Sequence, residues 1–249
     1  MTGVTSSRPY LLLDAGGTLV YPQVELIRRA AENQGFDFAE TGIFTAFYRS
    51  IHELDVALRG GAGVEAMRAF LPSFLALAGA PTQAAKALLA EVEQLCRRPD
   101  GHPWSRTLWG RALPCARAAV EHLCAAGYRM AVVSNSDGTV ADVLADVGLA
   151  PYFEAIFDSA LLGVEKPDPQ IFRLVLAELG LEASQCLFVG DVFMIDVVGA
   201  NAAGIRAAHL DPLGLYAGWS GFHTRDLETF AHAVTSGDLD RLDARAIAT

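Results

Sequence analysis

The sequence predicts an α/β fold, a doubly wound parallel sheet that carries a separate helical insert. Short apolar runs of strand length alternate with helical patterns through residues 108–249, as in parallel sheets covered by helices on both faces. Another strand pattern opens the chain near residue 10. Residues 22–107 show only helical periodicity. We therefore expect a core formed by residues 1–21 and 108–249, with residues 22–107 as an all-helical insert.

The first predicted strand, Tyr10–Leu13, ends at Asp14 and is followed by a tight turn through Gly16 and Gly17. In the insert, apolar residues at helical spacing predict a long helix over 44–58, which Gly60 and its neighbours end. Two further helices are predicted over 64–77 and 82–96.

After residue 107, each helical pattern stops at a glycine and a short apolar strand follows. The predicted strands are Met130–Ser134, Ala155–Asp158, Leu187–Gly190 and Arg206–Leu210. A helix is predicted to begin at Pro169 and to end at Gly180, which are the residue types preferred at those two positions. Parallel α/β sheets bind ligands at the carboxyl ends of their strands, so polar residues there are the candidates for function.

Composition narrows the range of functions. The 249 residues carry a formal net charge of −10 and no cluster of basic residues, which argues against a nucleic-acid surface. No apolar run reaches the roughly 18–20 residues of a membrane helix, and no signal-peptide pattern opens the chain. The four cysteines form no CxxC pair, as expected for thiols in a reducing, cytoplasmic compartment. Only two lysines occur, Lys86 and Lys166.

Polar side chains stand where the predicted strands and helices meet. Asp14, Ser134 and Asp191 follow or end strands, Lys166 precedes the helix at Pro169, and Asp196 lies one turn beyond Asp191. In a parallel sheet these residues converge on one edge. A carboxylate nucleophile, a hydroxyl, a lone cation and two further carboxylates suit phosphoryl transfer, in which positive charge must accompany the anionic phosphoryl oxygens.

Four segments together resemble the haloacid-dehalogenase-like hydrolase superfamily. They are Asp14-Ala-Gly-Gly-Thr-Leu19, Val133-Ser-Asn135, Glu165-Lys-Pro-Asp-Pro169 and Gly190-Asp-Val-Phe-Met-Ile-Asp196. Each segment alone is weak, but their order and spacing across residues 10–21 and 108–212 match the family. The resemblance implies a Rossmann-like core with a helical cap of the C1 type, formed by residues 22–107, that closes over the site and selects the substrate.

The resemblance also implies roles in phosphoryl transfer. Asp14 is expected to attack phosphorus and to form an acyl phosphate, which water then hydrolyses. Lys166 is expected to bridge Asp14 and the phosphate, and Ser134 to hold the phosphoryl group with help from the amide of Asn135. The residues expected to contact the phosphorylated substrate are Ser134, Asn135, Lys166, Gly17 and Thr18.

A magnesium site is implied by the same resemblance. Its expected ligands are Asp14, the backbone carbonyl of Gly16, and Asp191, with Asp196 binding directly or through water. The expected function is Mg²⁺-dependent hydrolysis of a small phosphorylated metabolite, without nucleic-acid or membrane partners.

One position departs from the family pattern. Phosphatases of this kind usually carry a second aspartate two residues after the nucleophile, which protonates the leaving group; here that position is Gly16. Hydrolysis is therefore expected to be slow, or to favour esters whose leaving group needs no proton.

Several alternatives remain open. A catalytically weak protein that binds phosphate and metal would also lack the acid. A 2-haloacid dehalogenase needs neither the acid nor a metal, although the segment Gly190-Asp191 fits that class poorly. A phosphonate hydrolase would need a cap lysine, and Lys86 lies far along the insert. An actin-like ATPase loop is a more distant match to Asp14-Ala-Gly-Gly-Thr18.

Overall fold

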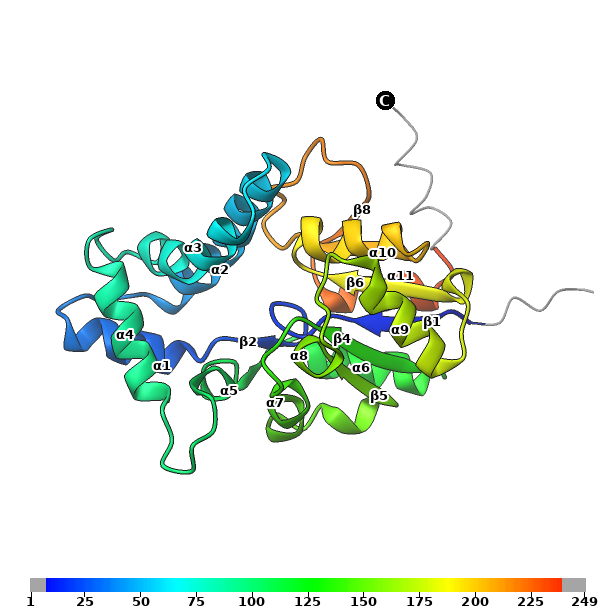
Figure 1. Ribbon diagram of the computed structural model, residues 1–249, viewed down its shortest axis with the longest axis horizontal. Coiled ribbons are helices and arrows are strands. Elements are labelled where there is room, and N and C mark those ends of the chain that lie inside the picture. The colour runs from blue at the N-terminus through cyan, green and yellow to red at the C-terminus, as the bar shows by residue number, and fades with distance from the viewer. Residues whose placement is uncertain (1–7, 239–249) are drawn as a thin grey trace, which may run out of the picture.

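The computed structural model describes residues 8–238, and its centre is a six-stranded parallel sheet (Figure 1). The strand order is β5-β4-β1-β6-β7-β8. The strands are β1 (Tyr10–Leu13), β4 (Met130–Ser134), β5 (Ala155–Asp158), β6 (Cys186–Gly190), β7 (Arg206–Leu210) and β8 (Phe222–Thr224). The predicted α/β fold class is confirmed, and the short edge strand β8 is an addition to the strands that the sequence predicts.

The first strand lies in the middle of this sheet. Leu13 of β1 pairs with Val132 of β4 on one side and with Val189 of β6 on the other. All four residues of β1 are buried, as expected for a central parallel strand. Asp14 therefore leaves the sheet between the carboxyl ends of β4 and β6.

Helices cover both faces of the sheet. Because side chains alternate along a strand, Leu11 and Leu13 pack on one face and Tyr10 and Leu12 on the other. The first face is covered by α6 (Ala116–Ala125), α7 (Val140–Asp146) and α11 (Leu227–Thr235). The second face is covered by α9 (Pro169–Leu179) and α10 (Val198–Ala202).

Four helices of the insert lie beside the sheet, on the left of Figure 1. They are α1 (Val24–Asn33), α2 (Glu40–Arg59), α3 (Val64–Leu77) and α4 (Ala85–Cys96). Helix α2 packs on α3, and α4 packs on both α1 and α3. The α3 bounds agree with the prediction, whereas α4 starts three residues later than predicted, after a turn. Within residues 8–238, no helix is both long and apolar enough to cross a membrane.

A short antiparallel pair connects the insert to the core. Strand β2 (Val20–Tyr21) pairs with β3 (Arg111–Ala112), and α5 (Trp104–Leu108) precedes β3. Two-residue strands leave no periodic signal in the sequence, so this pair was not predicted. The remaining elements are α8 (Ser159–Leu162), the 3₁₀ helices η1 (Ala150–Tyr152) and η2 (Ala183–Gln185), and the π-helix η3 (Phe193–Val197).

Candidate active site

The strand order brings the predicted site residues together at one edge of the sheet. Asp14, Ser134 and Asp191 lie at the carboxyl ends of three adjacent strands, β1, β4 and β6. Lys166 enters from the loop before α9, and Asp196 lies in η3, just after β6. All five residues are buried, although each is ionisable or polar. A cluster of buried polar and ionisable groups marks this edge as the candidate site.

Lys166 joins two of the carboxylates. Its Nζ lies 2.6 Å from Oδ1 of Asp14 and 2.6 Å from Oδ1 of Asp196, so the ammonium donates to both. Asn135 fixes the lysine backbone, because its Nδ2 donates to the Lys166 carbonyl and its Oδ1 accepts from the Lys166 N–H, both at 2.8 Å. This side-chain role of Asn135 was not predicted. It holds the loop that carries the only lysine of the site.

Burial dominates the electrostatics of these groups. Removal from water raises the pKa of Asp14, although the Lys166 ammonium opposes that effect. Removal from water also raises the pKa of Asp191, and the nearby charges of Asp14 and Asp196 add to it. Burial alone would lower the pKa of Lys166, but the same carboxylates raise it above its ordinary value. The lysine is therefore a fixed positive charge, and the carboxylates lack sufficient counter-charge.

The carboxylates fit a divalent cation. Asp14, Asp191 and Asp196 each offer an oxygen, and these oxygens lie within 4.8 Å of one another. Oδ1 of Asp191 is buried without a hydrogen-bond partner among the described residues. A Cβ atom at Gly17 would lie 1.8 Å from Oδ2 of Asp191, so only glycine leaves this carboxylate its place. Carboxylate oxygens suit Mg²⁺, and a bound cation would supply the missing charge.

Two hydrogen bonds orient the carboxylate of Asp196. Its Oδ2 accepts from the backbone N–H of Val192 at 2.9 Å, while its Oδ1 accepts from Lys166. A Cβ at Gly190 would lie 2.4 Å from Oδ2 of Asp196, so a glycine is required here as well. With both oxygens already occupied, direct coordination of a metal by Asp196 would compete with these bonds.

The three residues that follow Ala15 in the loop after Asp14 have different surroundings from one another. An indole carbon of Trp109 would lie 3.3 Å from a Cβ at Gly16, so a side chain here would press against the ring. The Gly17 carbonyl accepts from the Tyr48 hydroxyl of α2 at 2.8 Å. Thr18 is fully buried and lines a separate cavity. The side chain of Thr18 thus lies outside the cavity that contains Asp14.

One buried carboxylate near the site was not predicted. Asp55 of α2 accepts from the N–H groups of Phe193 at 2.9 Å and Met194 at 2.7 Å, and from the Tyr216 hydroxyl at 2.6 Å. Burial raises the pKa of Asp55 to about 6. The only sequence signal is a carboxylate on the apolar stripe of α2, directly after Leu54. Asp55 thus connects the insert, through hydrogen bonds, to the π-helix that carries Asp196.

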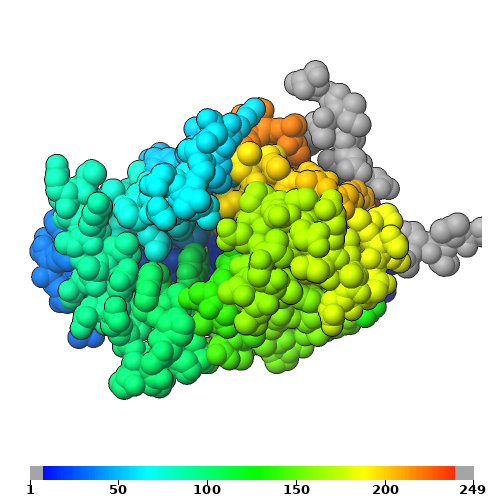
Figure 2. Space-filling model, viewed as in Figure 1, coloured from blue at the N-terminus to red at the C-terminus, as the bar shows by residue number. Residues whose placement is uncertain are grey.

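Two adjoining cavities lie above the strand ends, in the hollow that Figure 2 shows between the cyan helices and the green core. The inner chamber, of about 180 Å³, contains Asp14, Lys166, Asp191 and Asp196. The outer chamber, of about 370 Å³, extends from Ser134 toward α5, α7 and α8. Both chambers share the residues Gly16, Met67, Trp109, Ser134 and Asn135. This hollow is large enough for a small substrate.

Comparison with known proteins identifies the family. The family model for haloacid dehalogenase-like hydrolases matches residues 10–204, which include every candidate site residue. The chain belongs to the haloacid dehalogenase-like hydrolases. The resemblance inferred from its four sequence segments is thereby confirmed.

Curated relatives of this haloacid dehalogenase-like chain include several phosphatases. Phosphoserine phosphatase of Thermus thermophilus is 30% identical over 62% of this chain and 58% of its own length. Ribulose-1,5-bisphosphate 5-phosphatase of Halopiger xanaduensis is 35% identical over 44% of this chain and 46% of its own. Phosphoglycolate phosphatase of Pectobacterium atrosepticum is 41% identical over 36% of this chain and 39% of its own. These alignments span less than two thirds of each relative.

Solved structures of the family share the fold. YfnB of Bacillus subtilis, solved bound to magnesium, has a TM-score of 0.61 at 19% identity over 92% of this chain and 99% of its own. L-2-haloacid dehalogenase of Xanthobacter autotrophicus has a TM-score of 0.58 at 18% identity over the same shares of the two chains. A magnesium-bound hydrolase and a haloacid dehalogenase match about equally well, and the fold alone does not select the reaction.

Proposed function

We propose that this protein is a Mg²⁺-dependent hydrolase of a small phosphate monoester, with Asp14 as the nucleophile. The observation that carries the proposal is the arrangement around Asp14. Its carboxylate is buried, bonded to Lys166, and within 4.8 Å of carboxylate oxygens of Asp191 and Asp196. The Lys166 ammonium, together with a cation held by the carboxylates, would stabilise a reaction centre that carries negative charge. The phosphatase relatives support the same reaction class.

In this mechanism, a carboxylate oxygen of Asp14 attacks phosphorus, and the bond between phosphorus and the leaving oxygen breaks with its electron pair. Lys166 keeps Asp14 ionised and oriented, and its charge lowers the cost of bringing two anions together. Ser134 and the backbone amide of Asn135 hold the phosphoryl oxygens. Water then attacks phosphorus of the acyl phosphate, which releases inorganic phosphate and restores the Asp14 carboxylate.

The metal ligands proposed for this site are Asp14, Asp191 and the Gly16 carbonyl, with Asp196 binding directly or through water. Bound Mg²⁺ would neutralise charge on the phosphoryl oxygens and between the carboxylates. The unpartnered Oδ1 of Asp191 supports a cation here. The magnesium bound in YfnB adds support from the family.

The helical insert, residues 22–107, is proposed to act as a cap that closes over the chambers. Its helices α2 and α3 supply Phe47, Ile51, Leu54, Met67 and Phe70 to the inner chamber. Closure would exclude water and complete the substrate site. The proposed partner is a small phosphorylated metabolite, and the proposed location is the cytoplasm.

A second candidate function follows from Gly16. Residue 16 has no carboxyl group, and the Trp109 indole would lie 3.3 Å from a Cβ at this position, so the chain supplies no acid at the usual place. A protein that binds phosphate and metal but turns over slowly would have this arrangement. A metal-independent 2-haloacid dehalogenase is less compatible, because it would leave the cluster of Asp14, Asp191 and Asp196 without a counter-charge beyond Lys166.

A screen of phosphorylated metabolites and aryl phosphates with Mg²⁺ tests the proposal, with Asp14→Asn as the blank. We expect phosphate release that a chelator abolishes and added Mg²⁺ restores. Binding of phosphate and Mg²⁺ without turnover would support the second candidate. Activity that is indifferent to chelator, or halide release from 2-haloacids, would contradict the proposed function.

A further inference from the structure

Apart from its candidate site residues, the inner chamber has an apolar lining. Eight apolar residues line it, and six of them come from α2, α3 and the segment before β3. These six are Phe47, Ile51, Leu54, Met67, Phe70 and Trp109. Phe47 makes edge-on ring contacts with Phe70 at 5.8 Å and Trp109 at 5.9 Å between centroids. The group attached to the phosphoryl oxygen would therefore meet a packed apolar wall that is partly aromatic.

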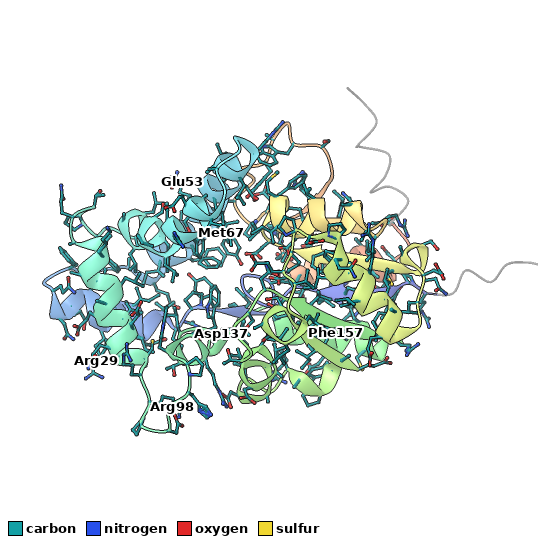
Figure 3. All side chains as sticks on the ribbon, viewed as in Figure 1. Arg29, Glu53, Met67, Arg98, Asp137 and Phe157 are labelled. Atoms are coloured by element: carbon teal, nitrogen blue, oxygen red, sulfur yellow. The ribbon has the colours of Figure 1, made fainter. Side chains whose placement is uncertain are left out.

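The outer chamber combines apolar residues with hydroxyl groups and carboxylates, and no Lys or Arg of the described residues lines it. Its lining includes the hydroxyl residues Ser105, Ser136, Thr139 and Ser159, and the carboxylates Asp137 and Glu165. Figure 3 shows Met67 and Asp137 on opposite sides of the hollow, the first on the insert and the second on the core. A substrate long enough to leave the inner chamber would meet hydroxyl groups and negative charge.

Lys166 is the only cationic side chain among the described residues that line either chamber, and it already pairs with Asp14 and Asp196. Arg106, which follows the lining residue Ser105 in the chain, pairs with Asp142 and Asp146 at 2.9 Å each. An anionic group on the substrate, apart from the phosphoryl group, would lose water here without gaining a charged partner.

From these linings we infer that the substrate of this site carries one anionic group only, its phosphoryl group, and that its leaving group is uncharged and apolar or aromatic beside phosphorus. The inference rests on the proposed function and specifies its substrate class. Ribulose-1,5-bisphosphate, phosphoglycolate and phosphoserine, which appear in the names of the phosphatase relatives, all carry a second anionic group. This chain would thus differ from those relatives in specificity.

A matched pair of esters tests the inference. 4-(Carbamoylmethyl)phenyl phosphate and 4-(carboxymethyl)phenyl phosphate have nearly the same shape, and a methylene insulates the phenol oxygen from the group that differs. We expect kcat/KM to be at least about 30-fold higher for the carbamoyl ester, because the carboxylate must be desolvated without a partner. Phenyl phosphate serves as the reference for the chemistry itself.

Two substitutions of Met67 test whether the chambers set the preference for the uncharged ester. Met67 lines both chambers, so Met67→Lys would bring a cation beside the carboxylate, whereas Met67→Gln changes polarity without charge. The preference for the carbamoyl ester should fall about tenfold or more in Met67→Lys relative to Met67→Gln. A ratio that is the same in both variants would argue that the chambers do not set this preference.

The outcomes separate the inference from the proposed function. Equal kcat/KM values for the two esters in the wild-type protein, or a preference for the carboxylate, would overturn the inference and leave the phosphatase proposal standing. Hydrolysis of phenyl phosphate without hydrolysis of the carbamoyl ester would also overturn it. Failure to hydrolyse any of the three esters, at the level of Asp14→Asn, would count against the proposed function itself.

Discussion

At the scale of single residues, the proposed role of Lys166 in phosphoryl transfer can be tested by substitution. Its ammonium bridges Asp14 and Asp196, and its side chain is 1% exposed. Lys166→Ala would remove the positive charge that favours attack on an anionic phosphoryl group. We expect kcat/KM to fall by about 10²-fold or more, as is typical when a preorganised charge is lost.

The other lysine provides the control for this substitution. Lys86 of α4 is exposed, so Lys86→Ala removes the same side chain without touching the site. Steady-state kinetics would be measured on both variants, with circular dichroism to check folding. A loss of less than about threefold in a folded Lys166→Ala variant would mean that Lys166 has a structural role only.

Gly16 leads to a second prediction at this scale. An aspartate at this position could protonate the leaving oxygen, but its Cβ would lie 3.3 Å from the Trp109 ring. We therefore expect the double variant Gly16→Asp/Trp109→Ala to hydrolyse an alkyl phosphate at least about tenfold faster than Trp109→Ala alone. Aryl phosphate turnover should change by less than about threefold, because a phenoxide leaves without protonation. An equal change for both ester types would refute this account of Gly16.

At the scale of elements, hydrogen bonds from Asp55 connect helix α2 to the π-helix η3. Asp55 accepts two backbone N–H groups of η3 and the Tyr216 hydroxyl, and all of these groups would lose their partner in Asp55→Ala. We expect the free energy of unfolding to fall by about 2 kcal/mol or more, because unsatisfied buried groups are costly. Mg²⁺ binding should also weaken, since η3 carries Asp196.

Glu53→Ala on the same helix is the matched control, because Glu53 is exposed and bonds only to Ser73 among the described residues. Its free energy of unfolding should change by no more than about 0.5 kcal/mol. Denaturant unfolding and calorimetric Mg²⁺ titration would be run on both variants. Unchanged Mg²⁺ affinity in Asp55→Ala would show that α2 does not position the metal site.

These residues also show what the sequence could predict. Asp14, Ser134 and Asp191 were predictable because each follows an apolar strand pattern, and the strand order of a parallel sheet then brings them together. Asp55 was not, since its partners Phe193 and Tyr216 lie more than 130 residues away and leave no local pattern. Helices and strands follow from local periodicity, whereas contacts between distant segments depend on packing that one sequence does not reveal.

At the scale of the whole molecule, the insert and the core touch at opposite ends of the hollow. Asp55 bonds to η3 at one end, and Arg106 of α5 pairs with Asp142 and Asp146 of α7 at the other. The predicted boundary near residue 107 thus falls within α5, which already contacts the core. The short strands β2 and β3 pair beside this boundary and connect the two parts.

This arrangement makes the exposed segment before α5 the expected cleavage site. Trypsin should cut first after Arg97, which lies between α4 and α5 and is exposed. The bond after Arg98 resists trypsin because Pro99 follows it. Mg²⁺ with orthovanadate, a phosphate analogue, should slow this cleavage by stabilising the closed form. Electrophoresis of timed digests would show the effect. Digestion at the same rate with and without these ligands would contradict a cap that closes on the site.

The central claim is that Asp14 attacks phosphorus. Its most direct test is a single-turnover reaction with an ester labelled in its phosphoryl group, quenched in acid and analysed by mass spectrometry of the digested protein. The account predicts a transient phosphoryl group on Asp14, which hydroxylamine removes and Asp14→Asn never acquires. Product release at the normal rate without label on Asp14, or with label on another residue, would contradict the account.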